Sequence, residues 1–236
     1  MKKRHDAIHV DMLRKKLDPQ REHWDTVYKL KPDYFGETPS EFARRALSFF
    51  KEKGAKKIIE LGCGEGRDTI MFLKEGFEVI AFDYSPVAIE HLMQKAKSNQ
   101  LSESLTAMIH DARDGIPLTD ECVDGIFSHM FFTMQLTEKE LDFIFQECLR
   151  VMKAGGFNIY SVRNIHDPHY GKGIHRGEDM WESPQKFVVH FFSLEKVKRL
   201  ARGYEICHIG EFDDPSPTYI KKLYEVILRK PEKKKE

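Results

Sequence analysis

The sequence predicts an α/β protein whose doubly wound, mostly parallel sheet is covered by helices on both faces. Between residues 57 and 162, short apolar segments alternate with amphipathic segments of helical length. Repeated strand–helix units of this size are typical of parallel strands joined by crossover helices. Farther along, the apolar segments 205–211 and 224–228 are separated by only twelve residues, 212–223. A connection this short favours an antiparallel hairpin over a helical crossover.

The first well-defined element is a helix that begins at Ser40 and ends before Gly54. Ser40 is a favourable N-cap residue. Apolar side chains recur behind it with helical spacing at Phe42, Ala46, Leu47, Phe49 and Phe50. Residues 1–39 contain scattered aromatic side chains without a clear period. We therefore expect helical fragments and a loop that form a flap in residues 1–39, followed by one domain in residues 40–236.

Strands and helices then alternate through the centre of the chain. Pro86 suits a first helical turn, and Gly76 suits a helix end. The segment 164–182 is rich in Gly, His, Asp and Pro, so we predict a long loop there. Ser193 is expected to cap a last helix that runs to about residue 202. The other predicted strands are 57–61, 77–82, 105–109, 123–128 and 157–162, and the other predicted helices are 67–74, 86–99 and 138–152.

Composition excludes several classes of function. Lys and Arg together number 38, as do Asp and Glu, and this neutral balance argues against a nucleic-acid partner. No apolar run approaches the roughly 20 residues that span a bilayer, so no membrane partner is expected. The basic residues Met1–Arg4 lack a following apolar signal-peptide core, which favours a cytoplasmic protein. The four cysteines form no CxxC pair, so a zinc ribbon is not expected.

Glycines on alternate positions follow the first predicted strand. The run is Glu60-Leu61-Gly62-Cys63-Gly64-Glu65-Gly66, and a predicted helix begins directly after it. Glycine adopts backbone angles that other residues avoid, and it lets a ligand approach the main chain. In open parallel sheets, ligands bind beyond the carboxyl ends of the strands, where the strand order reverses. The turn therefore predicts where a ligand binds.

Two further acids stand at the ends of the next two strands. Asp83 ends the second strand, 19 residues after Gly64, and an acid there typically accepts hydrogen bonds from ribose hydroxyls. Asp111 follows the third strand and could accept a bond from an adenine amino group, while the amide of Ala112 could donate to a ring nitrogen. The simpler interpretation is that Asp83 and Asp111 cap helices or turns. The glycine turn, Asp83 and the pair Asp111–Ala112 stand in order at the ends of three successive predicted strands, and this combination favours a nucleoside site.

The spacing of the glycines distinguishes between nucleoside ligands. Gly62, Gly64 and Gly66 alternate, whereas the dinucleotide fingerprint is GxGxxG, and no GK[ST] sequence follows that would indicate a P-loop. Glu60 places an acid beside the turn, which suits a cationic ligand better than a pyrophosphate. S-adenosylmethionine (SAM) carries a sulfonium and an ammonium group. SAM is therefore the predicted cofactor, and S-adenosylhomocysteine (SAH) its product.

In these features the chain resembles the class I SAM-dependent methyltransferases. The resemblance extends over roughly residues 40–230 and rests on the segments 60–66, 82–85, 110–112, 124–129, 149–157 and 190–195. It implies a Rossmann-like methyltransferase fold with a seven-stranded sheet and an antiparallel last strand. Residues 24–28 and 39–42 weakly resemble thiopurine and tellurite-resistance type members, in which the N-terminal segment closes over the cofactor. The cofactor-binding residues that we expect are Glu60, Gly62, Cys63, Gly64, Gly66, Asp68, Asp83, Tyr84, Ser85, Asp111, Ala112, Ser128 and His129.

Residues on the acceptor side are predicted from their positions in the chain. His129 follows the fourth strand, close to the expected place of the methyl group, and is a candidate catalytic residue together with Tyr170. A hydrogen-bonded structural histidine is an equal interpretation of His129. The histidines of the predicted long loop match no zinc spacing, so no metal site is predicted. The candidate acceptor-binding residues are Trp24, Tyr28, Asn164, His166, His169 and Tyr170.

The predicted activity is transfer of a methyl group from SAM to a small-molecule acceptor by in-line displacement. Three other functions stay open at this point: methylation of a protein, SAM binding without catalysis, and NAD-dependent oxidation. The glycine spacing disfavours the oxidoreductase, and the absence of an Asn/Asp-Pro-Pro-Tyr sequence after the fourth strand argues against methylation of nucleic-acid bases. The motifs specify the cofactor much more strongly than the acceptor.

Overall fold

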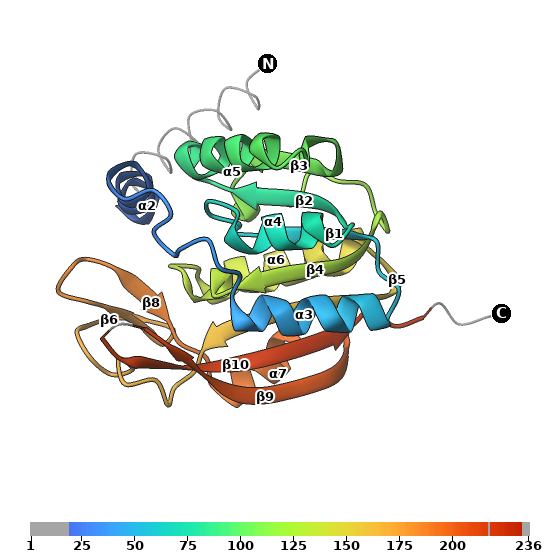
Figure 1. The fold of residues 1–236 in the computed structure, drawn as a ribbon. Helices are drawn as coiled ribbons and strands as arrows, with labels where there is room; N and C mark the ends of the chain where they lie inside the picture. Colours follow the sequence, from blue (N-terminus) through green and yellow to red (C-terminus); the bar gives the residue numbers. More distant parts are fainter. Residues whose placement is uncertain (1–18, 217, 233–236) are drawn as a thin grey trace, which may run out of the picture.

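The main sheet contains seven strands in the order β3-β2-β1-β4-β5-β10-β9. This description rests on a computed structural model, which describes residues 19–216 and 218–232 (Figure 1). The first five strands of that order are parallel, whereas β10 is antiparallel to both β5 and β9. The predicted fold class and hairpin are confirmed. The strands are β1 (Lys57–Leu61), β2 (Glu78–Asp83), β3 (Leu105–Ile109), β4 (Val123–His129), β5 (Met152–Arg163), β9 (Glu205–Pro215) and β10 (Ile220–Arg229).

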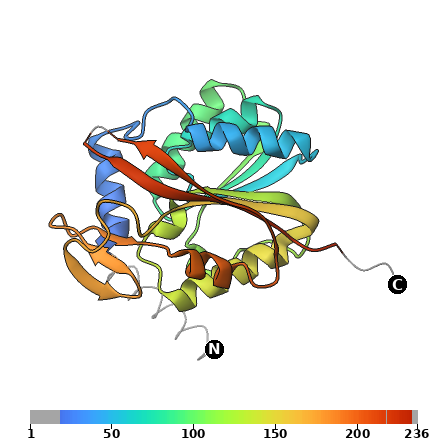
Figure 2. The same ribbon diagram turned by 90° about the horizontal axis from the view of Figure 1, so that it is seen from below.

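Helices cover both faces of this sheet (Figures 1 and 2). On one face lie α3 (Glu41–Glu52), α4 (Arg67–Lys74) and α5 (Pro86–Ser98), and on the other lie α6 (Glu138–Val151) and α7 (Leu194–Leu200). Short 3-10 turns η1 (Ser102–Ser104), η2 (Ala112–Asp114) and η3 (Phe131–Thr133) connect the larger elements.

Each sheet face has its own apolar core, because strand side chains alternate between the faces. Phe50, Phe72 and Phe127 belong to the core under α3 and α4, whereas Phe145 and Tyr160 belong to the core under α6. As predicted, Ser40 caps α3, accepting a hydrogen bond from the Ala43 amide at 3.0 Å.

The strand order reverses at β1, which lies between β2 and β4. The parallel strands point their carboxyl ends toward the edge of the sheet where α2 (Pro19–Leu30) lies (Figure 1). This reversal is where ligands bind in open α/β sheets. The fold therefore places the glycine turn, which follows β1, at the expected edge.

The predicted loop 164–182 is wrong in part, since it contains strands. A second sheet of three short strands, β6 (Ile174–Gly177), β7 (Met180–Glu182) and β8 (Val188–His190), follows β5. These strands have only three or four residues each, which is too short for a clear alternating pattern. Figures 1 and 2 show this small sheet beside α2, at the carboxyl edge of the main sheet.

The hairpin is longer than predicted, because β9 continues to Pro215 and β10 begins at Ile220. Opposite charges on the two strands stabilise this extension, since Lys221 pairs with Asp214 and Lys222 with Asp213, each at 2.7 Å. Both lysines carry their ammonium groups beside the carboxylate directly across the ladder.

Helix α2 lies inside the predicted flap 1–39, of which residues 1–18 are outside the described part of the chain. Gln20 joins α2 to two other segments: its Nε2 donates to the Val188 carbonyl at 2.5 Å, and its Oε1 accepts from the Gln135 amide at 2.8 Å. A third link runs from the Ser85 hydroxyl to Asp25 at 2.5 Å. The helix is thus connected to β8, to the segment before α6 and to the start of α5.

Candidate functional site

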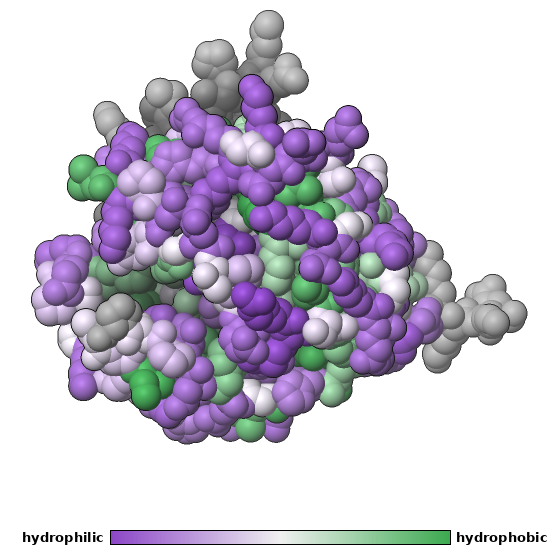
Figure 3. All heavy atoms as spheres, viewed as in Figure 1, coloured by the Kyte–Doolittle hydropathy of each residue, from purple (hydrophilic) through white to green (hydrophobic). Residues whose placement is uncertain are grey.

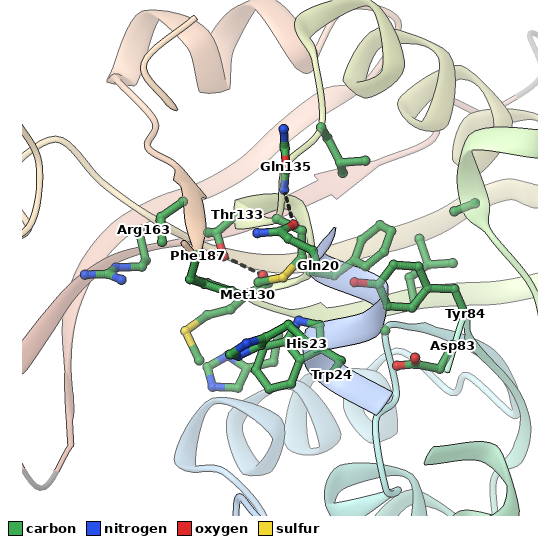
Figure 4. A pocket seen from close by; sticks show the side chains of 18 of the residues that line it. Gln20, His23, Trp24, Asp83, Tyr84, Met130, Thr133, Gln135, Arg163 and Phe187 are labelled. Atoms are coloured by element: carbon green, nitrogen blue, oxygen red, sulfur yellow. Dashed lines mark hydrogen bonds between the residues drawn. The ribbon is translucent and has the colours of Figure 1, made fainter. Parts of the chain in front are cut away.

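A cavity of about 510 Å³ lies at the carboxyl ends of the parallel strands. The space-filling view shows a recess with apolar walls on the side where α2 and the small sheet lie (Figure 3). This volume falls within the range of roughly 300–1,000 Å³ that is typical of small-molecule sites. In Figure 4, Asp83 and Tyr84 stand at one end of the cavity and Arg163 at the other, with Trp24 and Met130 between them.

The glycine turn forms part of the cavity wall. The amides of Gly62 and Cys63 both donate to the Phe82 carbonyl, at 2.8 and 3.0 Å, which fixes the turn against β2. Gly62 has a φ of +70° and lines the cavity. Cys63 and Gly64 line a smaller adjoining hollow.

Gly66 serves helix packing, and the structure does not bring it to the cavity. It has a φ of +83°, and a Cβ atom there would lie 2.3 Å from Cδ1 of Leu92 on α5. A side chain at this position would therefore require the Leu92 side chain or the helices to shift. The expectation that Gly66 touches the cofactor stays a prediction.

Asp83 points a buried carboxylate at the cavity. Its Oδ2 accepts from the Gly64 amide and its Oδ1 from the Ser85 amide, both at 2.9 Å. An ionised carboxylate offers about four acceptor positions, so two amide bonds leave capacity for ribose hydroxyls. Burial raises the pKa of Asp83 to about 6. Ser85 itself caps α5 and lies outside the cavity lining.

The third predicted segment also reaches the cavity, through Asp111 and Ala112, as does Tyr84. The Asp111 carboxylate caps η2 and accepts from the amide of Arg113 at 3.0 Å and from its Nη2 at 2.6 Å. Asp111 therefore has the turn-capping role of the simpler interpretation as well as the predicted position.

Glu60 and Asp68 line the adjoining hollow of about 80 Å³, together with Gly62 and His129. Glu60 accepts a hydrogen bond from the Thr69 hydroxyl at 2.5 Å, and burial raises the pKa of Glu60 to about 8. Asp68 accepts from the amide and the hydroxyl of Ser40, at 2.7 and 2.8 Å. The Asp68 carboxylate therefore anchors the start of α3.

His129 lies where the two hollows meet, since it lines both. Its Nδ1 is 2.6 Å from the Ser161 hydroxyl of the neighbouring strand. Burial lowers the pKa of His129 to about 4, so the imidazole is neutral at pH 7. Ser128 is fully buried in the sheet and lies outside both linings, so its role in cofactor binding stays a prediction.

The predicted acceptor residues divide into two groups. Trp24 and Tyr28 of α2 line the cavity and stack on each other with ring centroids 5.6 Å apart. His169 also lines it, and its ring lies 4.1 Å from that of Tyr219.

Asn164, His166 and Tyr170 lie outside the cavity lining, so the structure does not bring them to the cavity, and their roles in acceptor binding or catalysis stay predictions. Asn164 is buried and accepts a bond from the His166 amide at 3.0 Å. The His166 ring is 3.2 Å from Glu211, and the Tyr170 hydroxyl donates to Asp179 at 3.1 Å. Each of these three side chains is held by a partner elsewhere.

Several lining residues were missed by sequence reasoning. Arg163 ends β5, so the rule that ligands bind at strand ends could have identified it. Tyr219 directly precedes the antiparallel strand β10 and Lys221 lies at its start, where no sequence motif marks them. Further missed lining residues are Gln20, His23, Arg113, Phe131, Met134, Gln135, Ser183, Gln185, Phe187 and Val189.

A glycine turn after β1 and an acid at the end of β2, both facing one cavity, define a Rossmann-like nucleoside-binding protein. Within this class, residues 58–156 match the family described as methyltransferase domain. This match, together with the curated relatives, supports the predicted likeness to the class I SAM-dependent methyltransferases and the predicted cofactor, SAM.

The comparisons relate the chain to proteins that act on different acceptors. It is 28% identical over 126 residues to glycine/sarcosine N-methyltransferase from Parasynechococcus marenigrum, covering 50% of this chain and 42% of that protein. It is 26% identical over 125 residues to the 18S rRNA (guanine-N(7))-methyltransferase of Schizosaccharomyces pombe, covering 50% and 45%. The matched part of the chain thus spans less than half the length of these curated relatives.

A solved structure with the same fold is the Burkholderia thailandensis 1,6-didemethyltoxoflavin-N1-methyltransferase, with its bound 1,6-didemethyltoxoflavin and SAH. The TM-score is 0.65 at 15% identity, and the match covers 90% of this chain and 88% of that one. Among the described residues, no helix combines the length and apolar character needed to cross a membrane.

Proposed function

We propose that the protein transfers a methyl group from SAM to a small molecule bound in the same cavity. The observation that carries this proposal is the continuity of the cavity from Asp83, at the nucleoside end, to Arg163 at the far end. Helix α2 forms one wall of this space and is linked to β8 through Gln20. A cavity of this size suits a small acceptor better than a folded protein or RNA.

The residues at the nucleoside end fit the cofactor. Asp83 offers acceptors for the ribose hydroxyls, Gly62 allows close approach of the main chain, and Ala112 presents an amide near Asp111. Glu60, in the adjoining hollow, supplies a carboxyl group for an ammonium ion. When bound, SAM supplies a methyl group on a sulfonium, which is a good leaving group.

The main task of the protein is therefore to position the acceptor and exclude water. Transfer of the methyl group would form the bond to the acceptor atom as the carbon–sulfur bond breaks, SAH would leave as the product, and a proton carried by the acceptor atom would pass to water. His129 lies at the junction of the two hollows with Nδ1 engaged by Ser161. Its neutral ring can receive the acceptor's hydrogen bond through Nε2, which orients the reacting lone pair.

The test follows labelled methyl from SAM into a cell extract separated by size into small-molecule and macromolecular fractions. We expect label in the small-molecule fraction, with SAH formed in equal amount, and loss of both in Asp83→Asn. Asp120→Asn is the matched control, because Asp120 is exposed and pairs with Arg150 away from the cavity. Label in the protein or RNA fraction would contradict the proposal.

Binding measurements separate the remaining alternatives. A SAM-binding module without catalysis would bind SAH but transfer no label to any fraction. An oxidoreductase would quench NADH fluorescence on titration and would show no SAH binding by calorimetry. We expect SAH binding and no response to NADH.

A further inference from the structure

We infer that the acceptor is an anionic aromatic small molecule, held with its acidic group against Arg163 and Lys221. This inference rests on the proposed function and identifies the chemical class that the far end of the cavity recognises. The distribution of charge along the cavity is its first support. Asp83 and the pair Asp111–Arg113 line the nucleoside end, whereas the charged residues that line the other end are cations.

Arg163 is a buried cation whose ion-pair partner, Asp167, lies on the side away from the cavity. The side chain lines the cavity although the residue is only 6% exposed. Asp167 accepts from its Nε at 3.0 Å and also from its Nη2, yet Asp167 lies outside the cavity lining. A guanidinium has five N–H donors, and a forked carboxylate uses two of them. The pairing thus fixes the guanidinium and leaves donors for a second anion.

Asp167 also accepts hydrogen bonds from the surrounding backbone. It accepts from the His169 amide at 2.9 Å and from the Lys222 amide at 3.1 Å. One buried carboxylate therefore positions Arg163, the loop that carries His169, and the start of β10. The Arg163 guanidinium also lies over the rings of Phe191 and Tyr219, at 5.0 and 5.5 Å from their centroids. Such packing holds the cation in place without consuming its charge.

Lys221 repeats this arrangement on the neighbouring strand. Its side chain lines the cavity, and its Nζ pairs at 2.7 Å with Asp214, which lies outside the lining. Lys221 and Asp214 are directly opposite on β10 and β9. Two cations from adjacent strands thus face the cavity, with both carboxylates behind them. A carboxylate or phosphate group matches this pattern, whereas a cationic acceptor would be repelled.

The walls between the cations and the nucleoside end are aromatic. Trp24 and Phe187 meet edge to face with centroids 5.6 Å apart, and both line the cavity. Phe131 and the closely packed, tilted rings of His169 and Tyr219 line it as well. Flat rings bury large apolar areas against such walls. An aromatic body with one acidic group would therefore direct its other end toward His129.

The experiment measures binding to the protein saturated with SAH, by calorimetry. The probes are 4-hydroxybenzoate and 3,4-dihydroxybenzoate, each compared with its neutral carboxamide. We expect each acid to bind at least about tenfold more tightly than its amide. Lys221→Met should remove most of this difference. Lys222→Met is the matched control, because its exposed side chain pairs with Asp213 outside the cavity, and it should retain the difference.

Arg163→Lys tests the second cation while keeping its charge, since a full deletion would leave Asp167 buried and unpaired. We expect weaker binding of both acids with unchanged SAH affinity. Equal binding of acids and amides, no binding of any acid by SAH-saturated protein, or the same loss in both lysine variants would each overturn the inference and leave the proposed function intact. Failure of the wild-type protein to bind SAH would instead overturn the proposed function.

Discussion

Asp83 is the residue that we propose as the main polar contact to the cofactor. Its carboxylate is buried, and it accepts amide bonds from the turn after β1 and from the start of α5. The same group is proposed to accept the ribose hydroxyls, which it can do at full strength only when ionised. Because burial raises the pKa of Asp83 to about 6, protonation of this group begins not far below neutral pH.

We expect SAH affinity to fall more steeply with each pH unit below pH 6 than it does above pH 6. One pH unit below the pKa, about one tenth of a carboxyl group is ionised, so the Asp83 contribution at pH 5 is roughly a tenfold loss of affinity. Calorimetry between pH 5 and 8 measures this slope. Asp83→Asn should bind weakly and lack the extra fall below pH 6. An equally steep fall in the Asn variant would assign the titration to another group.

Glu60 leads to a second prediction, about proton release on SAH binding, which can be measured separately from the effect of Asp83. Burial raises its pKa to about 8, so the carboxyl group is mostly protonated at pH 7 before the cofactor binds. An ammonium ion placed beside it would favour the ionised form and release the proton. We expect SAH binding at pH 7 to release about 0.9 proton, measured by calorimetry in buffers of different ionisation enthalpy. Glu60→Gln should abolish the release. Unchanged release in that variant would show that Glu60 does not meet the ammonium group.

Position in the chain was enough to predict which residues reach the cavity where they stand at the ends of the parallel strands, as Gly62, Asp83 and Ala112 do. It did not predict that Gly66 and Ser128 lie outside the lining, because the sequence does not reveal which face of an element a residue occupies. Lys221 could not be identified, since it reaches the cavity through antiparallel pairing of β10 with β5.

At the scale of elements, the small sheet β6–β8 depends on a buried polar cluster. Nδ1 of His190 in β8 donates to the Leu136 carbonyl at 2.6 Å, and Nε2 lies 2.7 Å from the Lys196 ammonium of α7. Because a carbonyl only accepts, Nδ1 carries the proton and Nε2 accepts from Lys196. Asp179 and Glu138 also face that ammonium, at 2.9 and 3.4 Å.

We expect this cluster to make the fold sensitive to acid. Burial and the Lys196 charge lower the pKa of His190 to about 4, below its ordinary value of 6.5. The unfolded chain therefore takes up the proton first, and stability is lost as the pH falls from 6.5 through 4, by on the order of 3 kcal/mol. Urea unfolding at several pH values measures this loss. His190→Asn should unfold with a smaller pH dependence, and an unchanged dependence would contradict the assignment.

Element prediction worked between residues 40 and 162, where helical and strand periods are long enough to distinguish. It failed for β6, β7 and β8, whose few residues carry no periodic pattern. These strands exist because they pair with one another and pack on α2 and α7, which is information spread across the whole chain. Tertiary pairing also extended β9 through Asp213 and Asp214, residues that ordinarily interrupt strands.

At the scale of the whole molecule, the cofactor should stabilise the fold, because it joins β1, β2 and the turn after β3. A ligand at one hundred times its dissociation constant contributes about 2.7 kcal/mol. For a domain of this size, that corresponds to a rise in melting temperature of roughly 5–10 °C. Differential scanning fluorimetry with saturating SAH measures the shift. Asp83→Asn should lose it and Asp120→Asn should keep it, and a shift that survives in the first variant would contradict the site.

The division of the cavity between two parts of the chain has a consequence for how such enzymes diversify. The nucleoside end is lined mainly by residues up to Arg113, and the far end by β5, the small sheet and the start of β10. Replacing segments 164–190 and 216–222 by grafting from a relative would alter substrate choice while sparing the donor pocket. The far end of the cavity can therefore change in sequence while the nucleoside end stays the same.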